Sequence, residues 1–438
     1  MPDLASMAPA EFCRFLAETG IRRFYIVRDD ERGGVVASHE ALAPLATLLA
    51  QDTRDFDLHE GLFVQRAPRT GVLQGAFVHR TCRGQAAGGV RYWSYPSVEK
   101  FLRDGLRLAT GMTLKNALAG LWWGGGKGVM ARGTGDAEPG DPERRRSAYA
   151  EYGAFMTSLG GCYVTAEDVG TTVDDMAAIF SRTRFTTCIP PEVGGSGNPS
   201  PATAVGVVRG MQAALLHLGR GGLEGKTVVI QGLGEVGQHL AEELAKEGAG
   251  RLIAADVDPG RGAEMARRFP GVSVEFRPVE PGDPSILSEK CDVLAPCATG
   301  GVLGPLTIPR VEASVVCGAA NNQLEDPRRD DRLLHQRGTL YVPDFLVNRM
   351  GIVKCADEQY GVIENDARIQ RHLGREWEGG IHALTLRVLA EARESGETPH
   401  RVALELAQRR SLEKHPVWGH RGLEIIRGLV ASGWASGG

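Results

Sequence analysis

The sequence predicts an α/β protein of two domains, in which an N-terminal α/β domain and a doubly wound Rossmann-type domain are separated by a cleft. Three observations lead to this fold class. The 438 residues exceed what one hydrophobic core usually holds. Beyond residue 200, short apolar runs alternate with helical segments, as in a parallel sheet covered on both faces. One of these runs, TVVIQ (227–231), leads directly into a glycine-rich turn and a helix.

The change of rhythm near residue 200 also sets the expected domain division. We expect a substrate and catalytic domain over 1–200, which includes an extension at 1–60, and the Rossmann-type domain over 201–345. The remaining segment, 346–438, is mostly helical and polar. It is therefore expected to pack back onto the first domain and complete the cleft.

The extension begins with a helix around PAEFCRFLAETG, followed by a strand at FYIVR and a helix around EALAPLATLLAQ. Residues 63–81 predict a hairpin that turns at RAPRTG. Residues 20–36 faintly resemble that hairpin. A partial internal duplication and two unrelated hairpins explain this about equally well.

Three helices in the first domain carry start signals. The first begins at Ser97 and has an apolar stripe at helical spacing. The second begins at Asp141, which is followed by a proline and a glutamate, and its aromatic stripe is typical of core packing. The third begins at Thr172 with a capping box to Asp175.

The second domain is predicted from a helix and a series of apolar strands. The helix covers PATAVGVVRGMQAALLHL (201–218). The strands are TVVIQ (227–231), RLIAAD (251–256), DVLAPC (292–297), SVVCGA (314–319) and TLYVP (339–343).

Composition excludes several classes of function. Lys and Arg number 50 against 54 Asp and Glu, so no strong positive field attracts nucleic acid or an anionic membrane. There is no secretory leader pattern and no run of 18 apolar residues, so we expect a cytoplasmic protein that does not span a membrane. The eight cysteines show no CxxC spacing, which favours reduced thiols over disulfides or a metal site.

The glycine-rich turn predicts a dinucleotide site. In this turn, the first glycine allows a tight turn, the second allows close approach of a pyrophosphate, and the third allows helix and strand to pack closely. Asp256 ends the next strand, 19 residues after Gly237, where a carboxylate can accept hydrogen bonds from ribose hydroxyls. The turn consists of Gly232, Leu233, Gly234, Glu235, Val236 and Gly237.

The same carboxylate favours NAD over NADP. A 2′-phosphate beside Asp256 costs about 4 kcal/mol for each pair of unit charges near 4 Å. Arg261 is the near residue that could compensate. We therefore expect NAD as the cofactor.

Three charged residues lie beside glycine-rich or turn-forming backbone. Lys115 and Lys127 flank an apolar run that ends in three glycines, where a buried lysine loses several pKa units and can act as an acid or base. Asp168 follows the strand CYVT, at a strand end. Local sequence alone leaves the alternatives open, namely solvated lysines and helix capping by Asp168.

Together these motifs resemble the glutamate, leucine, phenylalanine and valine dehydrogenase family, and look closest to its leucine and phenylalanine dehydrogenases. The resemblance covers about residues 63–365 and continues more faintly to the C-terminus. The matching stretches are GQAAGGVR (84–91), GMTLKNA (111–117), GGGKGV (124–129), TAEDVGTT (165–172), GSGNPSPATA (195–204), the nucleotide turn, APCATG (295–300), NNQL (321–324) and YVPDFLVN (341–348).

The resemblance implies an NAD-linked, reversible oxidative deamination of an L-amino acid to a 2-oxo acid and ammonia. Lys127 would activate the water that attacks the imine, and Asp168 would carry protons to and from the amino nitrogen. Lys115 would bind the substrate carboxylate together with backbone of Gly88 and Gly89. Orientation of the nicotinamide and its ribose would fall to Thr203 and Asn321.

Substrate choice is implied by uncharged residues. A glutamate enzyme of this family is expected to have a lysine at the Ala87 position, so an apolar or aromatic substrate of the leucine, valine, phenylalanine or tryptophan type is favoured. Where relatives usually read NAGGV, this chain reads NRMGI (348–352), and Met350 would narrow the pocket floor. The positions matching the family's substrate pocket are Ala87, Ala166, Asn348, Ile352 and Cys355.

Two alternatives stay open at this point. The chain could be a catalytically altered family member that binds or regulates, which is motivated by Arg349, Met350 and the extension. It could also be a dehydrogenase of an unusual biosynthetic amino acid. The resemblance further implies a homo-oligomer built through the first domain, where the extension would lie close to such contacts.

Overall fold

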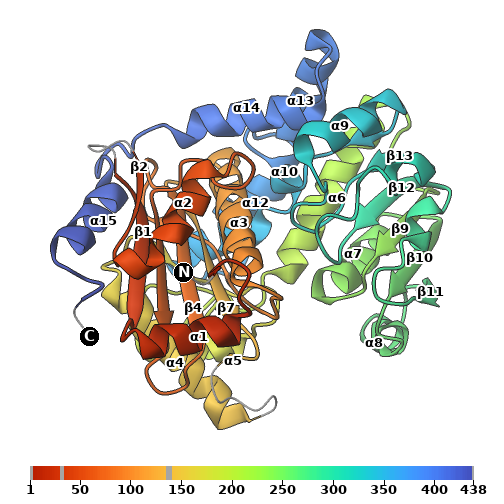
Figure 1. Cartoon of the computed structure of the whole chain (residues 1–438). Coiled ribbons are helices and arrows are strands. Elements are labelled where there is room, and N and C mark those ends of the chain that lie inside the picture. Colours follow the sequence, from red (N-terminus) through yellow and green to blue (C-terminus); the bar gives the residue numbers. More distant parts are fainter. Residues whose placement is uncertain (1–2, 30–33, 135–140, 437–438) are drawn as a thin grey trace.

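Two separate β-sheets form the framework of the protein (Figure 1). The computed structural model describes residues 3–29, 34–134 and 141–436. The first sheet is built from residues 23–164 and the second from residues 227–341. Helices cover both sheets, and the predicted two-domain α/β class is confirmed.

The first sheet is mixed, with the strand order β2-β1-β3-β4-β7-β5-β8 and with β6 paired beside β7. The predicted hairpin at 63–81 forms as the antiparallel pair β3–β4. In the extension, β1 and β2 also pair antiparallel, and the intervening residues 30–33 lie outside the described part of the chain. Because β1 pairs with β3, the extension adds an edge to this sheet. The strands are β1 (Arg23–Asp29), β2 (Gly34–Ala37), β3 (Gly61–Arg66), β4 (Leu73–Arg80), β5 (Ala86–Ala87), β6 (Val90–Trp93), β7 (Gly124–Ala131) and β8 (Tyr163–Val164).

Helices bury both faces of this sheet, and successive residues of β3 alternate between the two cores. Leu62 and Val64 pack with α1, α2 and α3, whereas Phe63 packs with α4 and α5 on the other face. The expected start residues cap their helices, with Ser97 before α3, Asp141 before α4 and Thr172 in a capping box before α5. The helices are α1 (Pro9–Glu18), α2 (Ala43–Gln51), α3 (Val98–Leu118), α4 (Pro142–Ser158) and α5 (Val173–Phe180).

The second sheet is parallel throughout, in the order β11-β10-β9-β12-β13-β14. All five predicted strands form, and their near-continuous apolar runs are buried between helices. The edge strand β11 was not predicted, because EFRP is short and half exposed. The strands are β9 (Thr227–Gln231), β10 (Arg251–Asp256), β11 (Glu275–Pro278), β12 (Cys291–Pro296), β13 (Ala313–Val316) and β14 (Leu340–Tyr341).

The helices of this half are α6 (Ser200–His217), α7 (Glu235–Lys246), α8 (Gly260–Arg268) and α9 (Pro327–Gln336). Short 3-10 helices occur at η1 (Glu40–Leu42), η2 (Pro191–Val193), η3 (Ser285–Ser288) and η4 (Ile308–Arg310). No helix in the described residues is long and apolar enough to cross a membrane. All eight cysteines lie in the described part of the chain and carry free thiols.

The C-terminal helices connect the two halves, as expected for a segment that packs back. Helix α13 packs against α6, and α14 packs against α3. In Figure 1 these blue helices run along one side of the molecule toward the first sheet. The helices are α10 (Asp344–Val347), α11 (Met350–Glu358), α12 (Ala367–Leu373), α13 (Ile381–Ser395), α14 (Pro399–Ser411) and α15 (Arg421–Ala431).

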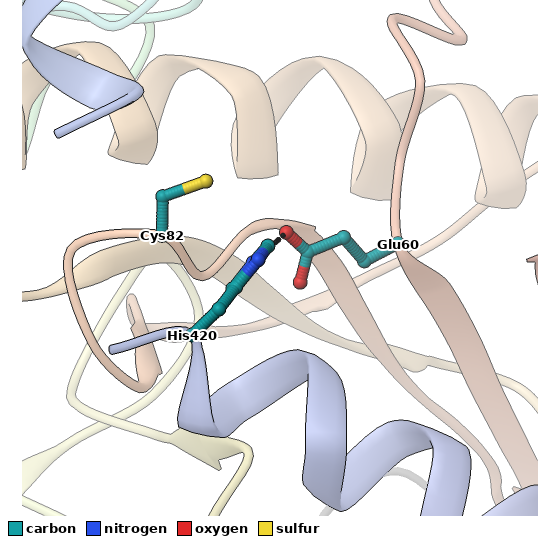
Figure 2. A group of neighbouring side chains, drawn as sticks. All are labelled: Glu60, Cys82 and His420. Carbon is teal, nitrogen blue, oxygen red and sulfur yellow. Dashed lines mark hydrogen bonds and ion pairs between the residues drawn. The ribbon is translucent and has the colours of Figure 1, made fainter. Parts of the chain in front are cut away.

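The start of α15 is held on the first sheet by a buried ion pair (Figure 2). His420 Nε2 lies 3.0 Å from Glu60 Oε1, and the Glu60 carboxylate also accepts hydrogen bonds from the Thr81 amide and hydroxyl. The neighbouring Cys82 thiol and the Glu60 carboxylate raise the pKa of His420 to about 9. The imidazole is therefore charged at neutral pH and stabilises the attachment of α15.

We expect Glu60→Gln to lower the free energy of unfolding by roughly 1–3 kcal/mol at pH 7, because each pKa unit of His420 corresponds to about 1.4 kcal/mol. The pKa of His420 is raised in the folded state, so the stabilisation is complete below the unfolded value of 6.5 and is lost as pH rises through about 9. Urea unfolding at pH 7 and pH 10 measures this.

The matched control is Glu424→Gln, which removes an exposed carboxylate of α15 that pairs with Arg427 at 2.9 Å. It should change stability by less than about 0.5 kcal/mol at both pH values. If Glu60→Gln lowers the free energy of unfolding equally at pH 7 and pH 10, the charge on His420 does not stabilise the attachment of α15.

Candidate active site

The glycine-rich turn lies where the sequence predicted it, between β9 and the first residue of α7. A Cβ at Gly237 would come within 2.1 Å of the Gly232 carbonyl oxygen, so only glycine permits this helix to start so close to the strand. A Cβ at Gly234 would meet no described atom within 4 Å. The turn therefore offers open space in front of the free amides of α7, which fits a dinucleotide pyrophosphate.

Asp256 supports this turn from the end of β10. Its carboxylate accepts hydrogen bonds from the Leu233 amide at 2.7 Å and the Asp258 amide at 2.9 Å. Arg261 is engaged elsewhere, because its guanidinium lies 2.6 Å from Glu264 and 3.7 Å from Asp258. The guanidinium that could accommodate a 2′-phosphate is thus already paired with carboxylates.

Lys115 lies in the last turn of α3 and reaches across to the second domain. Its Nζ donates to Asn321 Oδ1 at 2.5 Å, and Asn348 Nδ2 donates to the same oxygen at 3.0 Å. The lysine is 8% exposed. Burial lowers its pKa to about 8, against the opposing charge of Asp344.

Lys127 lies on β7 and forms an ion pair with Asp168, which follows β8. The Nζ–Oδ2 distance is 3.0 Å, and Lys127 is 2% exposed. Burial lowers the pKa of Lys127, partly offset by the Asp168 charge. Burial alone would raise the pKa of Asp168, but the charges of Lys127 and Arg91 outweigh this and hold it below its usual range.

Glycines bring these elements together. A Cβ at Gly125 of β7 would lie 2.2 Å from the Thr113 amide nitrogen, so a larger residue would push α3 and its Lys115 away from β7 and its Lys127. Gly88 and Gly89 occupy the turn between β5 and β6. The Gly88 amide donates to the Val164 carbonyl at 3.1 Å, so this N–H is already used within the sheet.

The predicted pocket residues gather on one side of these charges. Ala87, Ala166, Ile352 and Cys355 are all buried in a single apolar cluster of the first domain. The Cys355 thiol lies 3.3 Å from that of Cys188, a residue that the sequence did not single out. These four side chains carry no charge and offer no partner to a distal carboxylate.

The two long side chains at 349–350 do not lie at the pocket floor, where the sequence had suggested Met350. Met350 is fully buried in the core of the second domain, where it packs close to Gly206 of α6, so it does not form the pocket floor. Arg349 is also fully buried, and its guanidinium donates to the carbonyls of Leu118 and Gly379. Met350 therefore packs within the second domain, whereas Arg349 joins the start of α11 to the carboxyl end of α3.

Two further charged residues, Arg91 and Glu167, lie beside these side chains, and the sequence assigned a role to neither. Arg91 Nε lies 3.1 Å from Asp168, and its Nη1 lies 3.2 Å from Asp104. The motif GGVR contains this arginine, but nothing local to the motif shows which carboxylates it meets. Glu167 lies beside Asp168, and burial together with the charges of Glu235 and Asp168 raises its pKa to about 7.

Thr203 lies on α6, where its hydroxyl donates to the Pro199 carbonyl at 3.1 Å. The arrangement therefore joins a fixed cation, a lysine with a lowered pKa and a buried carboxylate beside a dinucleotide turn. This combination can hold an anionic substrate and move protons on it while water is excluded.

Family models match most of the chain. Residues 65–185 match "Glu/Leu/Phe/Val dehydrogenase, dimerisation domain", and residues 194–260 and 264–417 match "Glutamate/Leucine/Phenylalanine/Valine dehydrogenase". The chain belongs to this family. It is an amino acid dehydrogenase, and its Rossmann-type domain is that of a nicotinamide-dependent enzyme.

Named members of the Glu/Leu/Phe/Val dehydrogenase family are similar over most of their length. Leucine dehydrogenase of Geobacillus stearothermophilus is 44% identical over 70% of this chain and 79% of its own. Valine dehydrogenase of Streptomyces coelicolor is 40% identical over 82% of this chain and 93% of its own length. The crystal structure of L-tryptophan dehydrogenase from Nostoc punctiforme matches this structure with a TM-score of 0.61 and 34% sequence identity. The match covers 81% of this chain and 96% of that chain.

We expect Arg349→Ala to lower the free energy of unfolding by about 2–4 kcal/mol, because it opens a cavity and leaves the carbonyls of Leu118 and Gly379 unpaired. Urea unfolding at pH 7 measures this. The control Arg427→Ala alters an exposed arginine of α15 and should have little effect. If Arg349→Ala leaves the free energy of unfolding unchanged or raises it, the desolvation penalty of the buried guanidinium equals or exceeds the stabilisation from its hydrogen bonds.

Proposed function

We propose that this dehydrogenase catalyses the NAD-dependent, reversible oxidative deamination of an apolar or aromatic L-amino acid to its 2-oxo acid and ammonia. The observation that carries the proposal is the buried Lys127–Asp168 pair at 3.0 Å, with Lys115 reaching the same region from α3. Bound NAD supplies the acceptor for the hydride. The remaining chemistry consists of binding a carboxylate and moving protons, and the side chains named above can do both.

In this mechanism Lys115 binds the substrate carboxylate. Its present partner, Asn321 Oδ1, is a neutral oxygen that a carboxylate can replace with a stronger, charge-assisted hydrogen bond. Asn321 is then free to orient the nicotinamide group, and Asn348 holds the Asn321 amide in place. The pKa of Lys115, about 8 in the ligand-free protein, rises when an anion binds.

Lys127 in its neutral form removes a proton from water as that water attacks the imine carbon. Burial lowers the pKa of Lys127, so the neutral form is more accessible than for a lysine in water. Asp168 is a weak base while it lies between two cations. Once Lys127 is neutral, Asp168 loses one of these charges, and it can then exchange protons with the amino nitrogen.

The apolar cluster supports the choice of substrate. A second carboxylate on the substrate would be buried against Ala87, Ala166 and Ile352 without a cation, at a cost of several kcal/mol. Leucine, valine, phenylalanine and tryptophan avoid this cost. The small side chain of Ala87 leaves room for the larger of these.

Asp256 and the occupied Arg261 favour NAD over NADP. The first family model is described as a dimerisation domain, which supports a homo-oligomer built through the first domain.

We expect formation of NADH with hydrophobic L-amino acids in a panel of the twenty L-amino acids at alkaline pH. Lys127→Ala should lower kcat about a hundredfold to ten-thousandfold, because the base is lost. The control Lys100→Ala removes an exposed lysine of α3 and should retain full activity. Full activity of Lys127→Ala would contradict the proposed mechanism. An unaltered protein that is folded and binds NAD but turns over none of the amino acids would favour a binding or regulatory role.

Steady-state kinetics with the two cofactors test the cofactor assignment. We expect kcat/KM with NAD to exceed that with NADP at least tenfold, because a 2′-phosphate would meet the Asp256 carboxylate. Asp256→Ser should narrow this ratio. Equal or better efficiency of the unaltered protein with NADP would contradict the assignment.

A further inference from the structure

A cavity of about 660 Å³ lies between the first domain, helices α11 and α12, and the segment leading into α15. Its described lining does not include Lys115, Lys127 or Asp168. Val353 and Ala356 of helix α11 line the cavity, whereas Ile352 and Cys355 of the same helix belong to the apolar wall of the active site and are not in the described lining. The cavity is therefore distinct from the proposed substrate pocket.

One wall of the cavity is aromatic. The rings of Trp122 and His415 lie 5.5 Å apart in an edge-on contact, and those of His415 and Trp418 lie 6.3 Å apart. Trp122 is 43% exposed and Trp418 is 59% exposed. Tyr360 also lines the cavity and is exposed. The Arg83 guanidinium lies over the Trp122 ring, 4.2 Å from its centroid, and the exposed parts of these rings can stack on a planar ring.

The other feature of the cavity is positive charge without matching carboxylates. The Arg371 guanidinium contacts the ring of Trp377, and the Arg421 guanidinium contacts the ring of Trp418. Neither guanidinium pairs with a carboxylate among the described residues. Arg368 lies 3.9 Å from Asp357, which is the carboxylate of the described lining. The lining thus has more cationic than anionic groups.

A buried histidine also lines the cavity. His372 is 3% exposed, and its Nδ1 atom has no hydrogen-bond partner in the described structure. Burial and the guanidiniums of Arg349 and Arg371 lower its pKa to about 3. The described lining therefore holds three guanidiniums, one neutral ring nitrogen without a hydrogen-bond partner, and the single carboxylate of Asp357.

We propose that this cavity binds a small anionic ligand with a planar aromatic ring, at a site separate from the catalytic one. The ring stacks on Trp122 and Trp418, and the anionic group, a carboxylate or a phosphate, pairs with Arg371 and Arg421. The volume lies within the range of about 300–1,000 Å³ that is typical of small-molecule sites. The ion pair of His420 with Glu60 fixes the start of α15 and so positions Arg421 (Figure 2).

Isothermal titration of the full-length protein tests the proposal with four probes. Indole-3-acetate and 1-naphthyl phosphate each have a ring and an anion, and their comparison distinguishes a carboxylate from a phosphate ligand. Tryptamine has a ring and a cation, and acetate has an anion alone. We expect saturable binding of at least one ring-bearing anion and at least tenfold weaker binding of tryptamine and acetate.

Variants then locate the binding site. The double variant Arg371→Gln and Arg421→Gln should bind the anion at least tenfold more weakly. Trp418→Ala should weaken binding to the same extent, whereas Trp418→Phe should retain it. The control Arg427→Gln, on the same helix but outside the described lining, should bind as the unaltered protein does. Circular dichroism and thermal unfolding confirm that each variant is folded.

Three outcomes would overturn the proposal. These are no binding of either ring-bearing anion, equal binding by the folded double variant, and a site that proves to be covered by a second copy of the chain. Light scattering detects the last case, since the double variant would then lower the oligomeric state. None of these measurements requires turnover, and the double variant distinguishes this cavity from the proposed catalytic pocket, which would also accept an aromatic carboxylate.

Discussion

The buried ion pair of Lys127 and Asp168 is the interaction on which the rest of the structure depends. A charge removed from water is tolerated only when other charges or hydrogen bonds compensate for its lost hydration. Arg91 and Asp104 extend the pair into a chain of alternating charge below the site. The glycines of β7 allow α3 to lie directly on the strand, which brings Lys115 into the same water-poor region. This arrangement buries both lysines close to one carboxylate and lowers the pKa of each.

Much of the fold could be predicted because local patterns specify it. The apolar runs of β9, β10 and β12, the glycine turn and the capping residues Ser97 and Thr172 all formed as expected. The roles of Arg91 and Arg349 could not be predicted, since their partners lie far away in the sequence. Met350 was misplaced for the same reason, because a helical residue can face a pocket or a core and only tertiary packing decides which. The roles of Lys115, Lys127 and Asp168 came from family resemblance, and the structure adds that the three lie in one buried region.

The carboxyl end of α3 shows how distant segments control the site. The Leu118 carbonyl accepts hydrogen bonds from Arg349 and from Arg410, and the Leu121 carbonyl accepts one from Arg83. Cations at this end of a helix are favoured by its dipole. Because Lys115 lies one turn earlier, the C-terminal segment helps to fix the position of this buried lysine.

The aromatic contacts of Trp434 have a consequence for the order in which the chain folds. Its ring packs edge-on against Phe63 of β3 at 5.3 Å and lies 6.1 Å from Phe155 of α4, so it belongs to the core of the first sheet. That core therefore cannot close until residues from both ends of the described chain are present together. The second sheet takes all its strands from 227–341, and the buried cluster on one of its faces draws only on residues 229–341. The cluster on its other face also contains Leu118 of α3 and residues of α13 and α14, so this half too is completed only when the C-terminal helices are present. During synthesis Phe63 and Phe155 therefore stay uncovered, open to chaperones or misassociation, until the C-terminal residues emerge.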